Sequence, residues 1–369
     1  MKITVLQENL KHGLSLVSRA TSPRSTLPVL GNILVATENG RLRLAATNLE
    51  LSITCWIGAK IEREGAATVP ARTFFDLVNT LTPDAISLDY DEATSTMKLS
   101  CGKSKTKLKC ISADEFPPSP TFESEGIQIE AECLLEMIRQ TAFSASKDIA
   151  RSALTGVLVT IAEDDITFAS ADGFRLSEHK ARLSTPISEP VSALIPAKSL
   201  SELAHILKNK DEVVTMVFAN GRVVFRTPDA ELATQLIEGE FPDYRQIIPE
   251  GHTTRMVVPT DALRKACQQA GIFARNDSLV ATLDITEDTV EVSAQADELG
   301  SNRTQVAVVT EGPGMRIAFN THYLQDALDV IQTPSVALEV SDPVKPGMIR
   351  PMGEEQTFLH VLMPMNTVS

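Results

Sequence analysis

The chain has 369 residues, of which 43% are hydrophobic and only 5% aromatic, and its length favours two or three domains over a single core. Its 48 acidic and 34 basic residues give a formal net charge of −14. This charge argues against a protein that holds nucleic acid by bulk attraction, because each phosphate contact needs a local cation.

The cysteines and the apolar segments indicate the compartment. The five cysteines are odd in number and form no CxxC pair, which favours buried thiols in a reducing compartment over a disulfide framework or a zinc site. The first twenty residues lack the continuous apolar stretch of a signal peptide, and no run approaches eighteen apolar residues. We therefore expect a cytoplasmic protein without a membrane segment.

The first predicted element is an amphipathic helix in which Leu10, Leu14 and Val17 share one face. Alternating strands with short polar turns come after it, and a second helix is predicted to begin at the Pro70–Ala71 step. These elements are typical of an α+β domain, in which helices lie on one face of antiparallel sheets.

The strands after the second helix contain "CGKSKTKLKC", which raises two interpretations. "CGKSK" resembles the end of a phosphate-binding loop, but Met97 stands where the first glycine is needed, and the residues after the motif alternate like a strand. The second interpretation is a strand whose lysines share one face while Thr106, Leu108 and Cys110 share the other. Lysines in this pattern commonly protect a sheet edge.

The same order of elements occurs three times along the chain. Gly31 aligns with Gly156, a shift of 156 − 31 = 125 residues, and Phe116 aligns with Phe241 at the same shift. A fainter third copy places Asn320 where the second copy has Pro196. Three repeated domains are therefore expected, with boundaries at 1–124, 125–252 and 253–369.

Six motifs carry a resemblance to a known family. "TLPVLGN", "VPARTFF", "ADGFRL", "EFPDYR", "FNTHY" and "VLMPM" occur in this order on the threefold repeat. They resemble the motifs of bacterial DNA polymerase III beta subunits, the processivity sliding clamps, over essentially the whole chain. The resemblance implies a non-catalytic protein that needs no cofactor or metal and closes as a head-to-tail homodimer ring around duplex DNA, without sequence preference.

The resemblance also implies partners and site residues. The partners would be the clamp loader, the replicative DNA polymerase, and other polymerases or repair proteins that carry clamp-binding motifs. The basic residues of the helices and their flanks, taken with the resemblance, give a set of expected DNA contacts: Arg24, Arg72, Lys147, Arg151, Lys198, Asn320 and Tyr323.

Partner peptides are expected in a cleft between the second and third repeats, where Arg175 would bond the peptide backbone and Met365 would act as a movable flap. Its residues would be Leu154, Ala171, Gly173, Arg175, Leu176, Pro242, Ile247, Val344, Pro346, Val361, Leu362, Met363, Pro364 and Met365. The dimer interface would join the first repeat of one copy to the third of the other, through Lys103, Lys105, Thr106, Lys107, Leu108, Ile272, Phe273, Asp297 and Glu298.

Other functions are weighed against this one. Without the resemblance, acids that interrupt the basic helical faces would favour an ordinary solvated surface, and each apolar cleft residue alone would be assigned to the core. A monomeric three-repeat scaffold that binds peptides and never encircles DNA is the main alternative. For an enzyme, Asp172, Arg175 and His179 could suggest acid–base chemistry, but a tight Asp-Gly turn between two strands explains them better.

Overall fold

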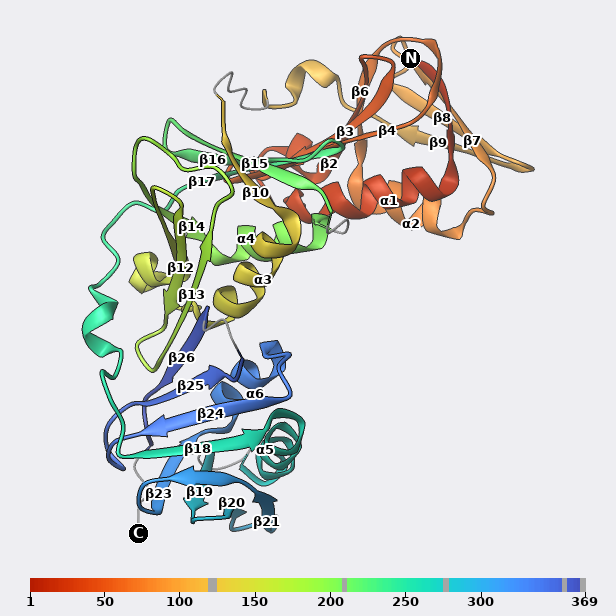
Figure 1. The fold of residues 1–369 in the computed structure, drawn as a ribbon. Helices are drawn as coiled ribbons and strands as arrows, with labels where there is room; N and C mark the ends of the chain where they lie inside the picture. The colour runs from red at the N-terminus through yellow and green to blue at the C-terminus, as the bar shows by residue number, and fades with distance from the viewer. Residues whose placement is uncertain (119–124, 208–210, 275–278, 354–356, 366–369) are drawn as a thin grey trace. The chain divides into compact units, whose positions relative to one another are not determined.

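The structure is a computed structural model that describes residues 1–118, 125–207, 211–274, 279–353 and 357–365. The expected boundary at residue 124 and the tail 366–369 lie outside these residues. Single helices are separated by runs of antiparallel strands along the described chain (Figure 1), in agreement with the α+β prediction. None of the helices in the described part is long and apolar enough to span a membrane.

The helices follow the predicted repeat, two to each copy. Their bounds are α1 Gln7–Val17, α2 Ala71–Thr80, α3 Ala131–Thr141, α4 Ala197–Ile206, α5 Thr260–Ala274 and α6 Thr321–Val330. Helices α2 and α4 begin directly after Pro70 and Pro196, which confirms the predicted start at the Pro-Ala step. In the third copy α6 begins directly after Asn320, the residue that aligns with Pro196. The apolar face of α1 is buried as predicted, and Gly13 lets this helix lie close to the sheet, because a Cβ there would stand 2.7 Å from Cδ1 of Leu44.

Internal contacts divide the chain into two compact units. The first unit consists of Met1–Glu132 with Glu202–Leu236, and the second consists of Cys133–Ser201 with Ile237–Ser369. The division therefore passes through the second repeat and does not follow the repeat boundaries.

The first unit contains two antiparallel sheets. The five-stranded sheet has the order β5 (Lys60–Arg63), β1 (Lys2–Leu6), β7 (Ala85–Asp91), β8 (Thr96–Cys101) and β9 (Ser104–Lys109). The eight-stranded sheet has the order β10 (Ile127–Glu130), β15 (Val213–Ala219), β16 (Arg222–Arg226), β17 (Ala230–Gln235), β4 (Leu51–Ile57), β3 (Arg41–Thr47), β2 (Asn32–Glu38) and β6 (Ala66–Pro70).

The second unit also contains two antiparallel sheets. The nine-stranded sheet has the order β14 (Val191–Pro196), β11 (Gly156–Ala162), β12 (Asp165–Ala171), β13 (Arg175–Arg182), β26 (Phe358–Leu362), β25 (Gly347–Pro351), β24 (Ser335–Val340), β18 (Thr254–Pro259) and β22 (Val309–Glu311). The four-stranded sheet has the order β21 (Gly300–Ala307), β20 (Thr289–Ala296), β19 (Val280–Ile285) and β23 (Met315–Asn320).

Each of the two large sheets is shared by consecutive repeats. In the eight-stranded sheet, β17 of the second repeat pairs with β4 of the first. In the nine-stranded sheet, β26 of the third repeat pairs with β13 of the second. The second repeat is thus joined to both neighbours by backbone hydrogen bonds, which explains why the compact units divide it.

The two smaller sheets end in strands that correspond to these joints. The five-stranded sheet ends at β9, the last strand of the first repeat, and the four-stranded sheet ends at β21, the third-repeat counterpart of β4 and β13. In the described chain neither strand has a sheet neighbour on its outer side. An end strand of this kind presents unpaired backbone N–H and C=O groups.

Candidate functional site

The candidate site is built around the hairpin turn between β12 and β13 in the second unit. Oδ1 of Asp172 accepts hydrogen bonds from the backbone N–H groups of Phe174 (2.9 Å) and Arg175 (3.1 Å). Gly173 has φ +94°, a conformation that L side chains rarely adopt. Nη1 of Arg151 donates to the carbonyl of Asp172 at 3.1 Å. The predicted Asp-Gly turn is therefore present and held from both sides.

The end of the chain lies along this hairpin. Strand β26 pairs with β13, so that Leu176 is opposite Val361 and Arg175 is opposite Leu362. The strand ends before Pro364, which cannot donate to the ladder. The backbone N–H of Met363 then donates to the carbonyl of Phe174 (2.9 Å). The chain end is thereby fixed to the hairpin turn.

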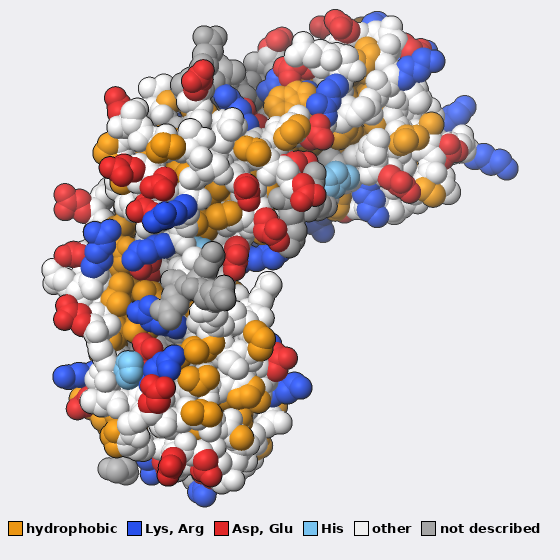
Figure 2. All heavy atoms as spheres, viewed as in Figure 1, with side chains coloured by type: hydrophobic (Ala, Val, Ile, Leu, Met, Phe, Trp, Pro, Cys, Tyr) orange, Lys and Arg blue, Asp and Glu red, His pale blue; other side chains and the backbone are white. Residues whose placement is uncertain are grey.

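An apolar floor covers one face of the sheet beside this turn. We define the floor as the buried cluster Ala169, Ala171, Leu176, Tyr244, Met348, Leu359 and Val361. Phe241 and Ile248, from the last segment of the second repeat, pack against it. Figure 2 shows hydrophobic side chains reaching the surface over the part of the sheet that holds β12, β13 and β26, with charged side chains around them.

Exposed apolar side chains occur in the segments around this floor. Met363 is 39% exposed, Phe174 is 54% exposed, and Ile247 and Val344 are also exposed. Phe174 is absent from the residues predicted for the cleft, although it stands inside the "ADGFRL" motif. A large apolar residue at the tip of a tight turn could have been recognised from the sequence, because such a tip has little neighbouring chain to bury it.

The predicted cleft residues differ in how accessible they are. Ala171, Leu176 and Val361 belong to the floor, and the exposed or half-buried residues are Leu154, Gly173, Arg175, Pro242, Ile247, Val344, Pro346, Met363, Pro364 and Met365. Leu362 is fully buried and belongs to a different cluster, with Phe319 and Leu324 of the third repeat. Successive strand residues point to opposite faces, so Val361 and Leu362 cannot both line one surface.

Arg175 is held by three elements. Its Nε donates to Oδ2 of Asp172 (3.1 Å), its Nη1 to Oδ2 of Asp326 in α6 (2.5 Å), and its Nη2 to the carbonyl of Phe143 (2.9 Å). The guanidinium lies over the rings of Phe143 and Tyr323, 5.4 Å and 4.3 Å from their centroids. Its side chain is only 8% exposed. Most of its bonding capacity is used inside the protein.

Two expected DNA contacts therefore lie next to cleft residues. Tyr323 stacks on Arg175, and burial, followed by the charge of Asp172, raises the pKa of its phenol. Arg151 bonds the Asp172 carbonyl of the hairpin turn and also pairs with Asp148 at 3.3 Å. Asn320 caps α6 by accepting from the N–H of His322 at 2.9 Å.

The other four expected DNA contacts are exposed. Arg72 and Lys198 lie in the first turns of α2 and α4, while Arg24 and Lys147 lie in loops. Arg72 is within 3.8 Å of Asp76, one helical turn further on. Arg24 and Arg72 belong to the first unit, and Lys147 and Lys198 belong to the second.

Two buried histidines connect the strands behind the floor. Nδ1 of His360 bonds Oγ of Ser177 (2.8 Å), which in turn bonds Oγ of Ser144 (2.7 Å), and Nδ1 of His179 bonds Oε1 of Gln140 (2.6 Å). Burial lowers the pKa of His179 to about 4. Burial, with a smaller effect from the charge of Arg175, lowers the pKa of His360 to about 3. Both imidazoles are therefore neutral at ordinary pH.

A second polar pair lies on the floor side of β13. Tyr244 donates from its hydroxyl to Oε2 of Glu178 at 2.7 Å, and Nζ of Lys180 pairs with Oε1 of the same carboxylate at 2.9 Å. Burial, and then the bond to Glu178, raises the pKa of Tyr244. This pair ties the segment that carries Phe241 to the sheet, so it fixes one side of the floor.

The expected dimer residues occur on two separate elements. Lys105, Thr106, Lys107 and Leu108 belong to the end strand β9, where the lysines are exposed and Leu108 is buried beneath them, and Lys103 lies in the turn before it. Ile272, 56% exposed, and the half-buried Phe273 lie near the end of α5, which packs on β20 and β21. Asp297 and Glu298 are exposed in the turn that leads into β21.

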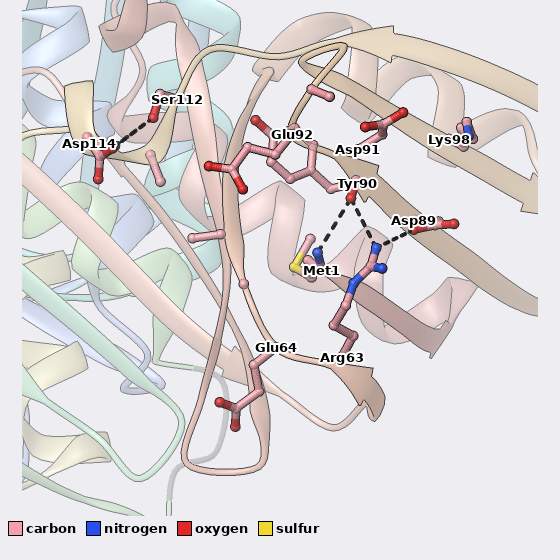
Figure 3. A pocket seen from close by; sticks show the side chains of 14 residues that line it. Met1, Arg63, Glu64, Asp89, Tyr90, Asp91, Glu92, Lys98, Ser112 and Asp114 are labelled. Atoms are coloured by element: carbon pink, nitrogen blue, oxygen red, sulfur yellow. Dashed lines mark hydrogen bonds and ion pairs between the residues drawn. The ribbon is translucent and has the colours of Figure 1, made fainter.

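No catalytic or metal centre emerges from the described residues. A hollow of about 1000 Å³ in the first unit (Figure 3) is rich in carboxylates, with Arg63 held between Asp89 and the carbonyl of Tyr90. The hydroxyl of Ser112 donates to Asp114 there, but no histidine is among the residues that line the hollow. Across the described chain, no cluster of three or more His, Cys, Asp or Glu residues is arranged to hold a metal ion.

The cysteines are structural in character. All five lie in described parts of the chain and none forms a disulfide there, with Cys55, Cys101 and Cys267 buried. Burial raises the pKa of the Cys55 and Cys267 thiols to about 12, which makes them poor nucleophiles at neutral pH.

Comparison with known proteins identifies relatives over the full length of the chain. Residues 1–120, 128–243 and 245–366 match the N-terminal, central and C-terminal domains of the DNA polymerase III beta subunit family. The chain is 32% identical to the beta sliding clamp of Synechococcus elongatus, over 99% of each chain, and 28% identical to that of Staphylococcus aureus, over 100% of each.

Solved structures agree with these matches. The DNA polymerase sliding clamp of Bacillus subtilis superposes with a TM-score of 0.93 at 27% identity, covering 100% of this chain and 99% of that one. A sliding clamp of Pseudomonas aeruginosa, solved bound to griselimycin, has the same TM-score and identity and is covered completely in both chains.

Proposed function

This chain belongs to the family of DNA polymerase III beta subunits, the beta sliding clamps, and we propose that two copies of it close head to tail into a ring around duplex DNA. As a member of that family it is a non-catalytic subunit that gives the polymerase its processivity. We take its domains as residues 1–124, 125–252 and 253–369. We expect it in the bacterial cytoplasm, where a clamp that encircles chromosomal DNA would act.

The observation that carries the ring is the pair of end strands β9 and β21. Within the chain, the last strand of one repeat joins the preceding repeat twice, as β17 with β4 and as β26 with β13. β9 is the last strand of the first repeat, and β21 is the third-repeat counterpart of β4 and β13. The same pairing between repeats would therefore join β9 of one copy to β21 of the next. Two such joints pair both copies of β9 with both copies of β21, so a closed ring leaves neither of these strands as an exposed sheet edge.

The side chains around these strands are complementary. Lys103, Lys105 and Lys107 give the β9 edge a positive surface, and Asp297 and Glu298 give the approach to β21 a negative one. Thr106 and Leu108 lie on the opposite side of β9 from Lys105 and Lys107. Thr106 is half-buried and would meet Ile272 and Phe273, whereas Leu108 is already buried in its own copy and would only support this contact from behind. We expect the apolar contact to supply most of the energy, since exposed ion pairs contribute only about 0–1 kcal/mol each.

The helices would form the lining of the ring. Each copy would supply the helices α1 to α6 of its described residues, which makes twelve for two copies. At about 10 Å per helix the lining would be roughly 120 Å around and the hole roughly 38 Å across, which admits a duplex with a layer of water. Arg24, Arg72, Lys147 and Lys198 are our candidates for phosphate contacts. Retention would come from topology and not from affinity, so a net charge of −14 is compatible with sliding.

The apolar floor and its exposed rim would receive partner peptides. Clamp-loader and polymerase segments with two or three apolar side chains would bury them against the floor, with Met363 and Phe174 closing over them. Methionine suits such a surface because its flexible, polarizable side chain adapts to different partners. We assign Tyr323 and Arg151 to this cleft instead of the DNA lining, because each contacts the β12–β13 turn or Arg175.

Retention on circular DNA tests the ring directly. Protein loaded by its clamp loader onto nicked circular DNA should remain bound through gel filtration, and linearising the same DNA with a restriction enzyme should release it. A monomeric peptide-binding scaffold would be retained on neither DNA, and a groove-binding protein would be retained equally on both. Either result would contradict the proposal.

A further inference from the structure

We propose that Arg175 acts as a positioning residue of the peptide cleft: it holds helix α6 against the β12–β13 hairpin and does not itself bind the peptide backbone. This inference rests on the proposed function of the cleft. It departs from the expectation drawn from the sequence, in which Arg175 is a direct peptide contact.

The guanidinium of Arg175 is already occupied by the protein. Each of its three nitrogens donates to a protein acceptor: the carboxylates of Asp172 and Asp326, and the carbonyl of Phe143. The rings of Phe143 and Tyr323 lie within cation–π distance of its charge. Three of the five N–H groups of the guanidinium are used in this way. The side chain is only 8% exposed, so a peptide carbonyl would have little access to the other two.

The partners of Arg175 belong to elements that are far apart in the sequence. Asp172 belongs to the hairpin turn, Phe143 to the short 3-10 helix Ala142–Ser144, and Asp326 to α6, 151 residues further along the chain. Arg175 therefore joins the second repeat to the middle of α6. The other end of α6 is held separately, by Arg264, whose guanidinium donates to the carbonyls of Leu328 and Ile331.

Helix α6 is also linked to the rim of the cleft. The N–H of Met365 donates to the carbonyl of Ala318 (2.8 Å) in β23, the strand that leads directly into α6. The N–H of Met363 donates to Phe174 in the hairpin turn. The chain end thus runs between the two elements that Arg175 ties together. A shift of α6 relative to the hairpin would change the spacing that Met363 and Met365 span.

A double-mutant cycle separates positioning from direct contact. Binding of a fluorescein-labelled synthetic peptide, copied from the tail of the replicative polymerase, would be measured by fluorescence polarisation for Arg175→Ala, Asp326→Asn and the double variant. We expect each single change to weaken binding by about fivefold or more, and the double variant to bind no more weakly than Arg175→Ala. Arg182→Ala, which removes an exposed arginine at the other end of β13, should bind as the unaltered protein does.

Amide hydrogen exchange in α6 distinguishes a positioning role in the cleft from a general contribution of Arg175 to stability. Peptide should slow amide exchange in α6 of the unaltered protein, and this slowing should be lost in Arg175→Ala. The inference would be overturned if Asp326→Asn bound the peptide normally while Arg175→Ala did not. It would also be overturned if the losses of affinity in the two single variants multiplied in the double variant. A third contradicting result would be variants with lowered melting temperatures but unchanged peptide affinity. If the unaltered protein bound no peptide, the proposed function of the cleft would itself fail.

Discussion

His360 and His179 are two imidazoles that the fold takes out of water without a charged partner for the protonated ring. Their hydrogen bonds run to a serine hydroxyl and to a glutamine amide oxygen. Within the described residues, Nε2 of His360 is buried without a hydrogen-bond partner. The neutral form is therefore strongly preferred in the folded state. This preference makes the stability of the second unit dependent on pH.

The direction of that dependence is set by the lowered pKa values. Above pH 6.5 both histidines are neutral in the folded and unfolded chains, so their contribution to stability is fully present. As the pH falls below 6.5 the unfolded chain takes up protons that the folded chain refuses, until the folded pKa values of about 4 and about 3 are reached. At pH 5 each histidine should lower the free energy of unfolding by about 2 kcal/mol.

Urea unfolding at pH 8 and pH 5 checks this prediction. His360→Gln should flatten the pH dependence by about 2 kcal/mol relative to the unaltered protein, whatever the variant does to stability at pH 8. The matched control is His205→Gln, at an exposed histidine of α4. A His360→Gln variant that kept the full pH dependence would contradict the assignment.

Among the structural elements, features set by neighbouring residues could be predicted from the sequence, whereas contacts between distant residues could not. Helix starts after Pro70 and Pro196 and the alternation of Leu108 with its neighbouring lysines are local, and the structure confirms them. The same alternation would have separated Val361 from Leu362, had it been applied to the chain end. The partner of Arg175 could not be predicted, because Asp326 lies 151 residues away and many arginines and acids could have paired.

Strand β26 and the residues after it give the first prediction at this scale. Met363→Ala should weaken binding of the polymerase-tail peptide about tenfold, since burying a methionine side chain is worth roughly 1.5–3 kcal/mol. Removing residues 364–369 as well should abolish binding, while the ring still closes on circular DNA. Fluorescence polarisation measures the affinity.

Val309→Ala is the matched control for this prediction. It removes an exposed apolar side chain from β22, at the far end of the same sheet. Equal affinity of Met363→Ala and the unaltered protein would mean that peptides bind elsewhere. Unfolding of the truncated protein, measured by circular dichroism, would mean that the chain end serves the core instead.

The end of helix α5 gives the second prediction at this scale. Ile272→Ala combined with Phe273→Ala should convert the proposed dimer to monomers, because it removes the apolar contact expected to face β9. Sedimentation velocity across a dilution series measures the change. Ile149→Ala, at an 85% exposed position in the second repeat, is the control and should stay dimeric. A double variant that remains dimeric at low concentration would show that the interface lies elsewhere.

At the scale of the whole molecule, we expect ring closure to retain the protein on DNA and the exposed cations to guide the duplex. A chain with a net charge of −14 cannot rely on bulk attraction to DNA, yet exposed cations remain on α2 and α4 and in nearby loops. In a closed ring these cations need only guide the duplex. They should act additively and without regard to base sequence, since they reach only phosphates.

Salt titration of binding to a short linear duplex tests this division. Lys198→Ala should lower the slope of log K against log salt by about 0.9, the value for one lost phosphate contact, for every duplex sequence tried. Lys60→Ala, an exposed lysine on β5, should leave the slope unchanged. A marked preference among duplex sequences would contradict a lining that only follows the backbone.

Because β9 and β21 are two different end strands that can pair with each other, each copy could bind one further copy at each of them. Such a head-to-tail contact can be repeated without limit. Joining two copies again leaves one end of each kind, and growth stops only when the accumulated rotation completes a full turn. In the proposed ring, the β4–β17 and β13–β26 joints contribute to that rotation together with the β9–β21 joints. If two copies close as proposed, a substitution that bends the β4–β17 or β13–β26 joint should prevent closure and yield filaments instead.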